Sequence, residues 1–434
     1  MIRRVKQGGS IMALTRRAVL GMLAGTASAP LAPSWASSPP PWYSLIPPAV
    51  APDGSIPGWR SLGGRATYRL EAGEIVGTSV EKSPNTFLCT EELFGDFILE
   101  FEVKTDPRLN TGVMIRAESK PDYRNGVVHG YQVEIDHAAR RWTGGLYDEQ
   151  RRLWLATPAH RPETQASFKS GGWNHLRVEA VGTRFRTWLN GLPAIVMVDD
   201  MTPRGFIGLQ VHDVGPDPAN AGLEVRFRNL RIITDDPARY MRRPLDVTDE
   251  QDFIANHISA ERAALGWRLL WNGQDGAGWS GLSAAGWRIE QGVIIRDSAA
   301  TPLVTADRFA DFDLEMDVRA TDGADGAVTY LGSAEYRLAQ GPQGQGDSAS
   351  GTLIGKVPAR NLTDPNPDKP SMKPAGHWNR VRILARGDRI EHWLNGSKLV
   401  EGSRAALGLP TSGPVLLRPG QGRLEFRSVR IHPL

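Results

Sequence analysis

The sequence has almost no cysteine and no excess of one charge. Cys89 is the single cysteine among 434 residues, so no disulfide can form within the chain, and its apolar neighbours predict a buried, unreactive thiol. Lysine and arginine number 51 against 48 aspartate and glutamate residues. This near-balance gives no electrostatic reason to expect a nucleic acid or an anionic membrane as a partner. We expect a neutral, soluble target instead.

Long hydrophobic runs are also missing. The apolar run from Leu20 to Ala29 is shorter than the roughly 18 residues that a membrane-spanning helix needs, so we expect no stable membrane span. The run follows Arg16-Arg17 and leads to small residues ending at Ala36, which is the order of a twin-arginine signal peptide. We therefore predict a signal over residues 1–36, cleaved near Ala36, and a periplasmic or secreted protein.

What the sequence does contain is turn-forming residues and tryptophan. It has 47 Gly, 31 Pro and 13 Trp, a composition that favours many short strands joined by tight turns over a helical bundle. Runs of four to eight residues alternate apolar and polar side chains, as half-buried strands do. Asn190-Gly191 and Asn395-Gly396 lie between such runs and predict tight hairpin turns.

The chain contains one module written twice. Three pairs of segments recur in the same order, which indicates a duplicated domain. The pairs are Trp173-Asn174 through Asn190-Gly191 with Trp378-Asn379 through Asn395-Gly396, Phe94 to Val103 with Phe309 to Val318, and Phe227-Arg228-Asn229 with Phe426-Arg427-Ser428.

The predicted organisation is all-β, with two tandem antiparallel β-sandwiches. The linker is expected to hold a helix over Asp249 to Leu265, with Thr248 as its N-cap. The predicted segments are a Pro-rich tether over 37–54, a first sandwich over 55–236, a linker over 237–264 and a second sandwich over 265–434.

The first module carries a series of short motifs that resemble the 3-keto-disaccharide hydrolase family, whose domains have a concanavalin-like or laminin-G-like jelly-roll fold. The order and spacing of the motifs hold throughout, although Glu and Gln are exchanged between positions 132 and 134. The motifs are Asn110-Thr111-Gly112-Val113 with Arg116, Gly130-Tyr131-Gln132-Val133-Glu134-Ile135-Asp136, Thr143-Gly144-Gly145-Leu146-Tyr147, Trp173-Asn174, Leu189-Asn190-Gly191, Gly208-Leu209-Gln210-Val211-His212 and Phe227-Arg228-Asn229.

The resemblance implies cleavage of glycosides that are already oxidised to a ketone at C3. The ketone acidifies the C2 proton, so a base removes that proton, the C1 substituent leaves, and water adds to the double bond. The expected partners are a 3-keto disaccharide or glycoside substrate and an upstream sugar 3-dehydrogenase. Such chemistry needs a base, an acid for the leaving group, and donors to the enolate oxygen.

Strand alternation predicts which side chains face the sugar. Gln132, Glu134 and Asp136 fall on one face of their strand, and Gln210 and His212 fall on one face of another. We expect Glu134 or His212 to be the base and Asp136 to orient or protonate. Arg116 and Gln210 are expected to hold the keto or enolate oxygens.

Further candidates surround this face. Tyr147, with Trp142 and Trp154, could stack on sugar rings, and His129 could act as a ligand or a base. Glu134, Asp136 and His212 could bind a divalent metal ion, although their spacing identifies none.

The second copy serves as an internal control. Aligned at Tyr131 with Tyr336, it has Arg337, Ala339 and Gly341 in place of Gln132, Glu134 and Asp136; it has Arg418 and Gly420 in place of Gln210 and His212, and Tyr330 in place of Arg116. Because the framework residues survive in this copy, we predict a folded but inactive second module.

Two other classes of function stay in view. Both modules could be lectin-like sandwiches that bind glycan without cleaving it. A conventional glycosidase needs paired carboxylates. Glycosidases of this kind of fold carry a third carboxylate shortly after a Glu-x-Asp motif, and this sequence has none at the corresponding positions after Glu134-Ile135-Asp136.

Overall fold

The computed structural model describes residues 39–284, 286–297, 301–340, 350–354 and 372–434. The predicted signal over residues 1–36, with its cleavage point, lies outside these residues, as does Gly341. The described chain is almost entirely β-structure and forms two sandwiches, as the sequence predicts. No helix in this part of the chain has the length and apolar character to cross a membrane.

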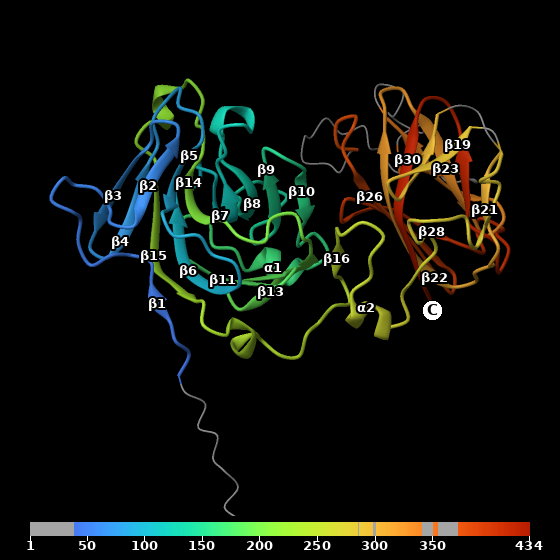
Figure 1. The fold of residues 1–434 in the computed structure, drawn as a ribbon, viewed down its shortest axis with the longest axis horizontal. Helices are drawn as coiled ribbons and strands as arrows, with labels where there is room; N and C mark the ends of the chain where they lie inside the picture. The colour runs from blue at the N-terminus through green and yellow to red at the C-terminus, as the bar shows by residue number, and fades with distance from the viewer. Residues whose placement is uncertain (1–38, 285, 298–300, 341–349, 355–371) are drawn as a thin grey trace, which may run out of the picture. The chain divides into compact units, whose positions relative to one another are not determined.

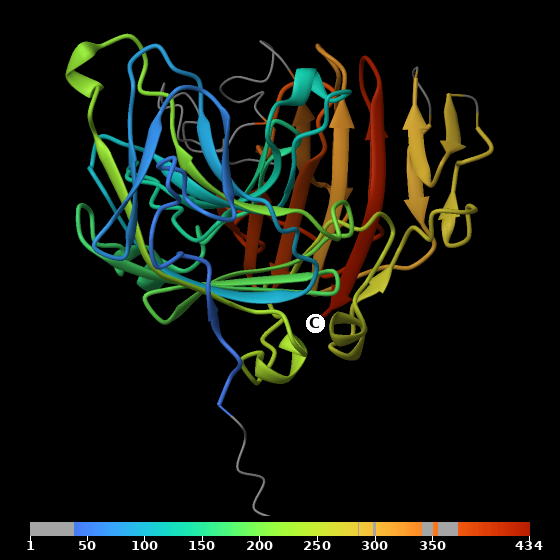
Figure 2. The same ribbon diagram turned by 60° about the vertical axis from the view of Figure 1, so that its left-hand side comes forward.

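Two sheets form the first sandwich (Figures 1 and 2). The first sheet has the spatial order β16 (Gln251–Asp252), β13 (Leu192–Val198), β12 (Arg184–Leu189), β11 (Asn174–Val181), β6 (Phe97–Thr105), β15 (Glu224–Ile233), β4 (Glu74–Thr78) and β3 (Thr67–Glu71), and β1 (Tyr43–Ser44) also pairs with β15. The second sheet has the order β10 (Leu153–Ala156), β9 (Leu146–Glu149), β8 (His129–Ile135), β7 (Thr111–Glu118), β14 (Phe206–Val211), β5 (Thr86–Thr90) and β2 (Trp59–Gly63).

The second sandwich repeats this plan. Its larger sheet has the order β19 (Trp287–Glu290), β20 (Val293–Arg296), β30 (Leu424–Pro433), β22 (Phe312–Ala320), β26 (Asn379–Arg386), β27 (Arg389–Leu394) and β28 (Ser397–Ser403), with β17 (Arg268–Leu269) paired to β30. Its smaller sheet has the order β18 (Trp279–Ser280), β21 (Leu303–Thr305), β29 (Leu416–Pro419), β23 (Asp325–Tyr330), β24 (Ala334–Ala339) and β25 (Leu353–Ile354).

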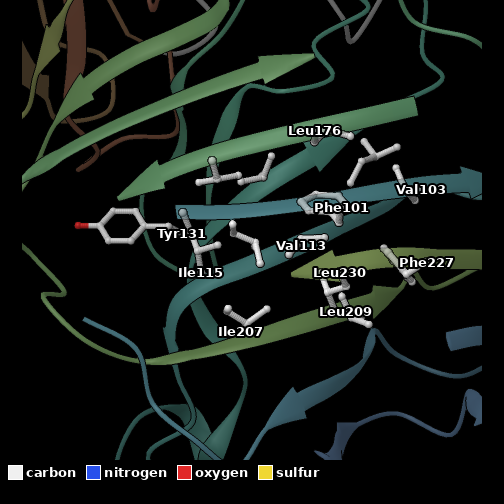
Figure 3. Packing of buried hydrophobic residues seen from close by; sticks show 14 of the residues in the cluster. Phe101, Val103, Val113, Ile115, Tyr131, Leu176, Ile207, Leu209, Phe227 and Leu230 are labelled. Carbon is white, nitrogen blue, oxygen red and sulfur yellow. The ribbon is translucent and has the colours of Figure 1, made fainter. Parts of the chain in front are cut away.

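Alternation along the strands builds the core of the first sandwich. Val113 and Ile115 of β7 and Ile207 and Leu209 of β14 point between the sheets and pack against the opposite sheet (Figure 3). Fully burying one such side chain stabilises the fold by about 1.5–3 kcal/mol. The alternate residues of these strands therefore face outward, and Gln210 of β14 is among them.

The predicted hairpin turns are confirmed. Asn190 and Gly191 have φ angles of 49° and 88° and join β12 to β13, and Asn395 and Gly396, with 48° and 84°, join β27 to β28. Positive φ at both central residues is what a two-residue hairpin turn requires. Cys89 is buried, and burial raises the pKa of its thiol to about 12, as expected of an unreactive cysteine.

The helix predicted for the linker is mostly wrong. Only α2 (Ala260–Ala264) is helical, and its N-cap is Ser259, not Thr248. Residues Gln251–Asp252 instead form β16 and pair in parallel with β13. Asn256 has a φ of 52°, which a right-handed helix does not accommodate. Tertiary pairing thus overrides the local helical pattern. The other α-helix, α1 (Pro162–Ala166), lies in the loop before β11.

Candidate active site

The predicted sugar-facing side chains meet in one cleft on the outer face of the second sheet of the first sandwich. The cleft has a volume of about 370 Å³. Six of the residues predicted from the sequence contribute to its lining, from strands β8, β9, β10 and β14 and from the residue after β14. The lining residues are Asn85, Asn110, Gln132, Glu134, Arg140, Tyr147, Glu149, Gln150, Trp154, Gln210 and His212.

Glycine on β7 makes room for the side chains of the cleft. A Cβ atom at Gly112 would lie 2.6 Å from side-chain carbons of Gln132. Since that distance is closer than van der Waals contact permits, any other residue at this position would displace Gln132. The Thr111-Gly112 motif therefore allows Gln132 of β8 to lie across the neighbouring strand.

Glu134 is a buried acid that keeps its proton near neutral pH. Its side chain accepts a hydrogen bond from Asn110 Nδ2 at 2.9 Å, and the residue is 5% exposed. Desolvation by burial raises the pKa of Glu134 to about 8, and the nearby negative charges of Asp136 and Glu149 act in the same direction. A carboxyl group that is neutral at pH 7 can donate a proton or a hydrogen bond.

His212 presents the opposite chemistry in the same cleft. Its Nδ1 lies 2.7 Å from the backbone oxygen of Asp213 and donates to it, which leaves Nε2 of the neutral ring as an acceptor. The backbone N–H of Asp213 in turn donates to Asn85 Oδ1 at 2.9 Å. The imidazole is thus held by its own strand end in the tautomer that suits a base.

Three amide side chains in the cleft are only partly satisfied. In the described part of the chain, Gln132 Nε2, Gln210 Oε1 and Asn110 Oδ1 are buried and have no hydrogen-bond partner. An unpaired buried polar atom costs about 1–3 kcal/mol. These atoms offer one donor and two acceptors to a polar ligand, such as the oxygens and hydroxyls of a sugar.

Two aromatic side chains, Tyr147 and Trp154, line the cleft. The ring of Trp154 packs edge-on against the rings of Tyr147 and Trp142, with ring centres 5.4 Å and 4.9 Å apart, respectively. The guanidinium of Arg140 lies 5.1 Å from the centre of the Trp154 ring. Burial and the negative charges of Glu149 and Glu134 raise the pKa of Tyr147 to about 12, so its hydroxyl keeps its proton.

The sequence reasoning missed several lining residues. Glu149 lies two positions after Tyr147 on β9, and period-2 alternation could have placed it on the same face. Asn110 lies in the Asn110-Thr111-Gly112-Val113 motif, for which the sequence predicts no role of its first residue in the site. Asn85, Arg140 and Gln150 come from strand ends and turns, where no periodic pattern applies.

Arg116 does not line the cleft, contrary to the predicted role in binding the keto oxygen. Its guanidinium donates to the backbone oxygens of Gly95, Gly182 and Ala180 and pairs with Asp96 at 3.0 Å. Arg116 has a φ of 45° at a bulge between β7 and β8, which breaks the alternation on which the prediction relied. Through these hydrogen bonds and this ion pair, Arg116 connects the ends of neighbouring strands.

Asp136 and His129 also lie elsewhere. The carboxylate of Asp136 accepts from the backbone of Ala138 and from Arg140 Nε at 2.6 Å, so it positions Arg140 and does not face the sugar. His129 is buried, stacks on Tyr123 at 4.1 Å and contacts the oxygen of Val127. Neither residue contributes to the lining of the cleft.

The predicted metal ligands do not come together. Asp136 is committed to the turn that carries Arg140, while Glu134 and His212 line the cleft without it. Among the residues that the structure describes, no group of three or more His, Cys, Asp or Glu side chains is arranged to hold a metal ion. These three residues therefore do not form the divalent metal site that the sequence left open.

The structure corrects the alignment of the second copy. The backbone of Glu134 bonds to Gly145 and Gly144, and the same bonds in the second sandwich join Arg337 to Thr352 and Gly351. Arg337 thus occupies the place of Glu134, two residues from the place that the Tyr131 to Tyr336 alignment predicts.

Neighbouring positions shift with it. Ala339 bonds to Ser350 as Asp136 bonds to Thr143, so Ala339 stands for Asp136, and Glu335 stands for Gln132. Leu331, with the same φ of 45°, stands for Arg116 in place of Tyr330. The matches of Arg418 to Gln210 and Gly420 to His212 agree with the strand register.

The polar face of the second copy is therefore rebuilt with charges and has not been lost. Arg337 pairs with Asp325 at 3.6 Å, and Arg418 pairs with Glu335. Asp325 stands where Asn110 does, so the neutral acid and amide of the first copy become an ion pair. These side chains neutralise one another and are more exposed than Gln132, Glu134 and Gln210.

Comparison with known proteins finds solved structures that are similar to part of this chain. Two solved structures described as putative glycosyl hydrolases from Parabacteroides distasonis are 22% and 20% identical, over 42% and 39% of this chain and 100% and 99% of theirs, with TM-scores of 0.35 and 0.33. The carbohydrate binding module CBM66 from Bacillus subtilis is 20% identical over 40% of this chain and 93% of its own, with a TM-score of 0.28. Curated proteins give no match.

A family model described as the 3-keto-alpha-glucoside-1,2-lyase-like domain matches residues 49–233 and again residues 266–432. The two matches coincide with the two sandwiches and together cover most of the sequence. The chain therefore belongs to the family of the 3-keto-alpha-glucoside-1,2-lyase-like domain, of which it carries two tandem copies.

Proposed function

We propose that the cleft of the first sandwich cleaves glycosides whose sugar carries a ketone at C3. His212 Nε2 removes the C2 proton, and the electron pair forms an enolate at C3. The enolate then expels the C1 oxygen substituent, which takes a proton from the carboxyl of Glu134. The first product is an enone, a 2-hydroxy-3-keto-glycal, and water adds to it to give the 3-keto sugar.

One observation carries this proposal: the carboxyl of Glu134 and the imidazole of His212 line the same cleft. Burial holds the pKa of Glu134 at about 8, and the Asp213 carbonyl directs the proton of the His212 ring to Nδ1. Elimination across C2 and C1 needs one base and one acid, which these two groups supply.

Amides replace arginine as the groups that hold the sugar oxygens. Gln132 Nε2 is a buried donor without a partner among the described residues, and it is suited to the C3 oxygen as negative charge develops there. Gln210 Oε1 is a buried acceptor suited to a hydroxyl. Trp154 and Tyr147 would pack on an apolar sugar face.

The cellular setting is part of the proposal. A 3-keto disaccharide or glycoside requires a sugar 3-dehydrogenase to form it, and this enzyme is the expected upstream partner. The Arg16-Arg17 pair and the short apolar run after it support export to the periplasm by the twin-arginine route.

The decisive experiment compares methyl 3-keto-α-glucoside with unoxidised methyl α-glucoside, using methanol release by the full chain as the readout. Methanol should form from the ketone alone, because only the ketone acidifies C2. Turnover of the unoxidised glycoside would indicate a conventional glycosidase. Binding of both compounds without release would indicate a lectin-like module.

A matched pair of variants locates the activity. Glu134→Gln should reduce methanol release by about 10² to 10⁴-fold, since it removes a general acid. Arg337→Gln changes the structural counterpart in the second sandwich and should leave release unchanged. Equal losses in both variants would argue against a site confined to the first copy.

A further inference from the structure

The cleft holds a second carboxylate, Glu149 of β9, that the elimination step does not use. Glu149 is 7% exposed and lines the cleft together with Glu134 and His212. Its negative charge contributes to the raised pKa of both Glu134 and Tyr147, so it lies close to both. When a carboxylate lies in the same site as a protonated acid, the carboxylate can act as a base and the acid as a proton donor.

The two oxygens of Glu149 have different surroundings. Oε1 accepts hydrogen bonds from Asn85 Nδ2 and from Gln150 Nε2, each at 3.3 Å. Within the described residues, no hydrogen bond reaches Oε2, and this atom is not among the buried polar atoms that lack a partner. One oxygen is thus held by two amides, and no hydrogen bond from a described residue holds the other.

Glu149 differs in its ion pairs from Asp148, its neighbour on the strand. Asp148 points to the other face, where Arg151 and Arg152 pair with it at 2.7 and 2.5 Å. In the part of the chain that the structure describes, no Lys, Arg or His forms an ion pair with Glu149. A carboxylate in a structural ion pair is a poor base, whereas Glu149 keeps its lone pairs available.

Asn85 links Glu149 to the base of the first step. Its Nδ2 donates to Glu149, and its Oδ1 accepts from the backbone of Asp213, the residue after His212. One amide side chain therefore connects the Glu149 carboxylate to the backbone next to His212, the residue that carries the C2 proton once elimination has occurred. Water placed between Glu149 and C1 would meet a base on one side and the electrophilic carbon on the other.

We propose that Glu149 activates the water that hydrates the enone, so that this chain completes hydrolysis instead of stopping at elimination. This inference rests on the proposed function of the cleft. The water oxygen bonds to C1 as Glu149 takes one of its protons, and the C1=C2 electron pair moves to form the C3 enolate. Protonated His212 then returns a proton to C2, which restores the ketone, and the proton on Glu149 passes to solvent.

The test separates elimination from hydration in the full chain. With methyl 3-keto-α-glucoside, Glu149→Gln should slow hydration by about 100-fold or more and should slow methanol release far less. The 2-hydroxy-3-keto-glycal then accumulates, as followed by its enone absorbance and by NMR. Formate added to Glu149→Ala should restore hydration by supplying an external base.

The control is Glu335→Gln, a carboxylate of the second sandwich that pairs with Arg418 and should affect neither step. Equal slowing of release and hydration in Glu149→Gln would overturn the proposal, because it would mean that Glu149 supports the cleft as a whole. Unchanged hydration would overturn it too. In a separate assay the wild-type chain receives the glycal directly, so that hydration is measured independently of cleavage. Failure to hydrate the glycal would overturn the role of Glu149, whereas failure to release methanol would overturn the proposed cleavage.

Discussion

The outer faces of the two smaller sheets use the same backbone positions for opposite purposes. In the first sandwich, Glu134 stays neutral beside Asn110, and two glutamine amides keep unpaired atoms. In the second, Arg337 and Asp325 occupy the places of Glu134 and Asn110 and form an ion pair. The two copies thus differ in whether the polar groups of this face form ion pairs with one another. A surface that satisfies its own charges has little left to offer a ligand.

The largest effect is expected when the first copy receives the Arg–Asp ion pair that the second copy carries at these positions. The double variant Asn110→Asp with Glu134→Arg should lose methanol release by about 10³-fold, because no acid remains. It should melt at a higher temperature than Glu134→Arg alone, since an unpaired buried cation costs several kcal/mol. A double variant that retains activity would refute the assignment of Glu134.

His212→Ala removes the base while leaving the scaffold in place. The second copy has Gly420 at this position, and the His212 ring bonds only to its neighbour Asp213 among the described residues. We expect a loss of about 10²-fold in kcat, with a change in unfolding free energy below about 0.5 kcal/mol. Kinetics and thermal melts on the same sample check both; a folded, fully active variant would contradict the proposal.

The pH profile tests which form of Glu134 works. The acid must be protonated, and with a pKa of about 8 it is protonated below pH 8 and ionised above. For a methyl leaving group, kcat/KM should therefore fall about tenfold per pH unit above pH 8. A 4-nitrophenyl leaving group needs no acid and should lack this limb. A rise in activity through pH 8 would make Glu134 the base.

The smallest effect is expected from the second copy. Arg418→Gln breaks the Arg418 to Glu335 pair, whose arginine side chain is 51% exposed. Exposed pairs contribute about 0–1 kcal/mol, so stability should change little, and activity should not change. Chemical denaturation and methanol release measure the two quantities. A marked loss of activity would mean that the second sandwich takes part in catalysis.

Local pattern was sufficient for much of this protein. Repetition of Trp-Asn and Asn-Gly segments identified two copies, and period-2 alternation placed Gln132, Glu134 and Gln210 on one outward face. It failed where the strands are irregular. Arg116 lies at a bulge with positive φ. The sequence alignment of the second copy with the first is displaced by two residues, because Tyr336 corresponds to Val133 in the strand register and not to Tyr131. A shift of two residues preserves alternation, so the pattern alone does not detect it.

By itself, the sequence determined the all-β class, the duplication, the hairpin turns and most of the polar side chains of the cleft, because these follow from alternation and turn chemistry between near neighbours. Only the tertiary structure decided that Glu149 and Asn85 join the site, that Asp136 and Arg116 leave it, and that residues after Thr248 pair with β13 before any helix begins. The physical reason is distance along the chain. Burial, hydrogen-bond partners and the pKa of Glu134 depend on groups that folding brings together from separate strands, and no local pattern encodes those distances.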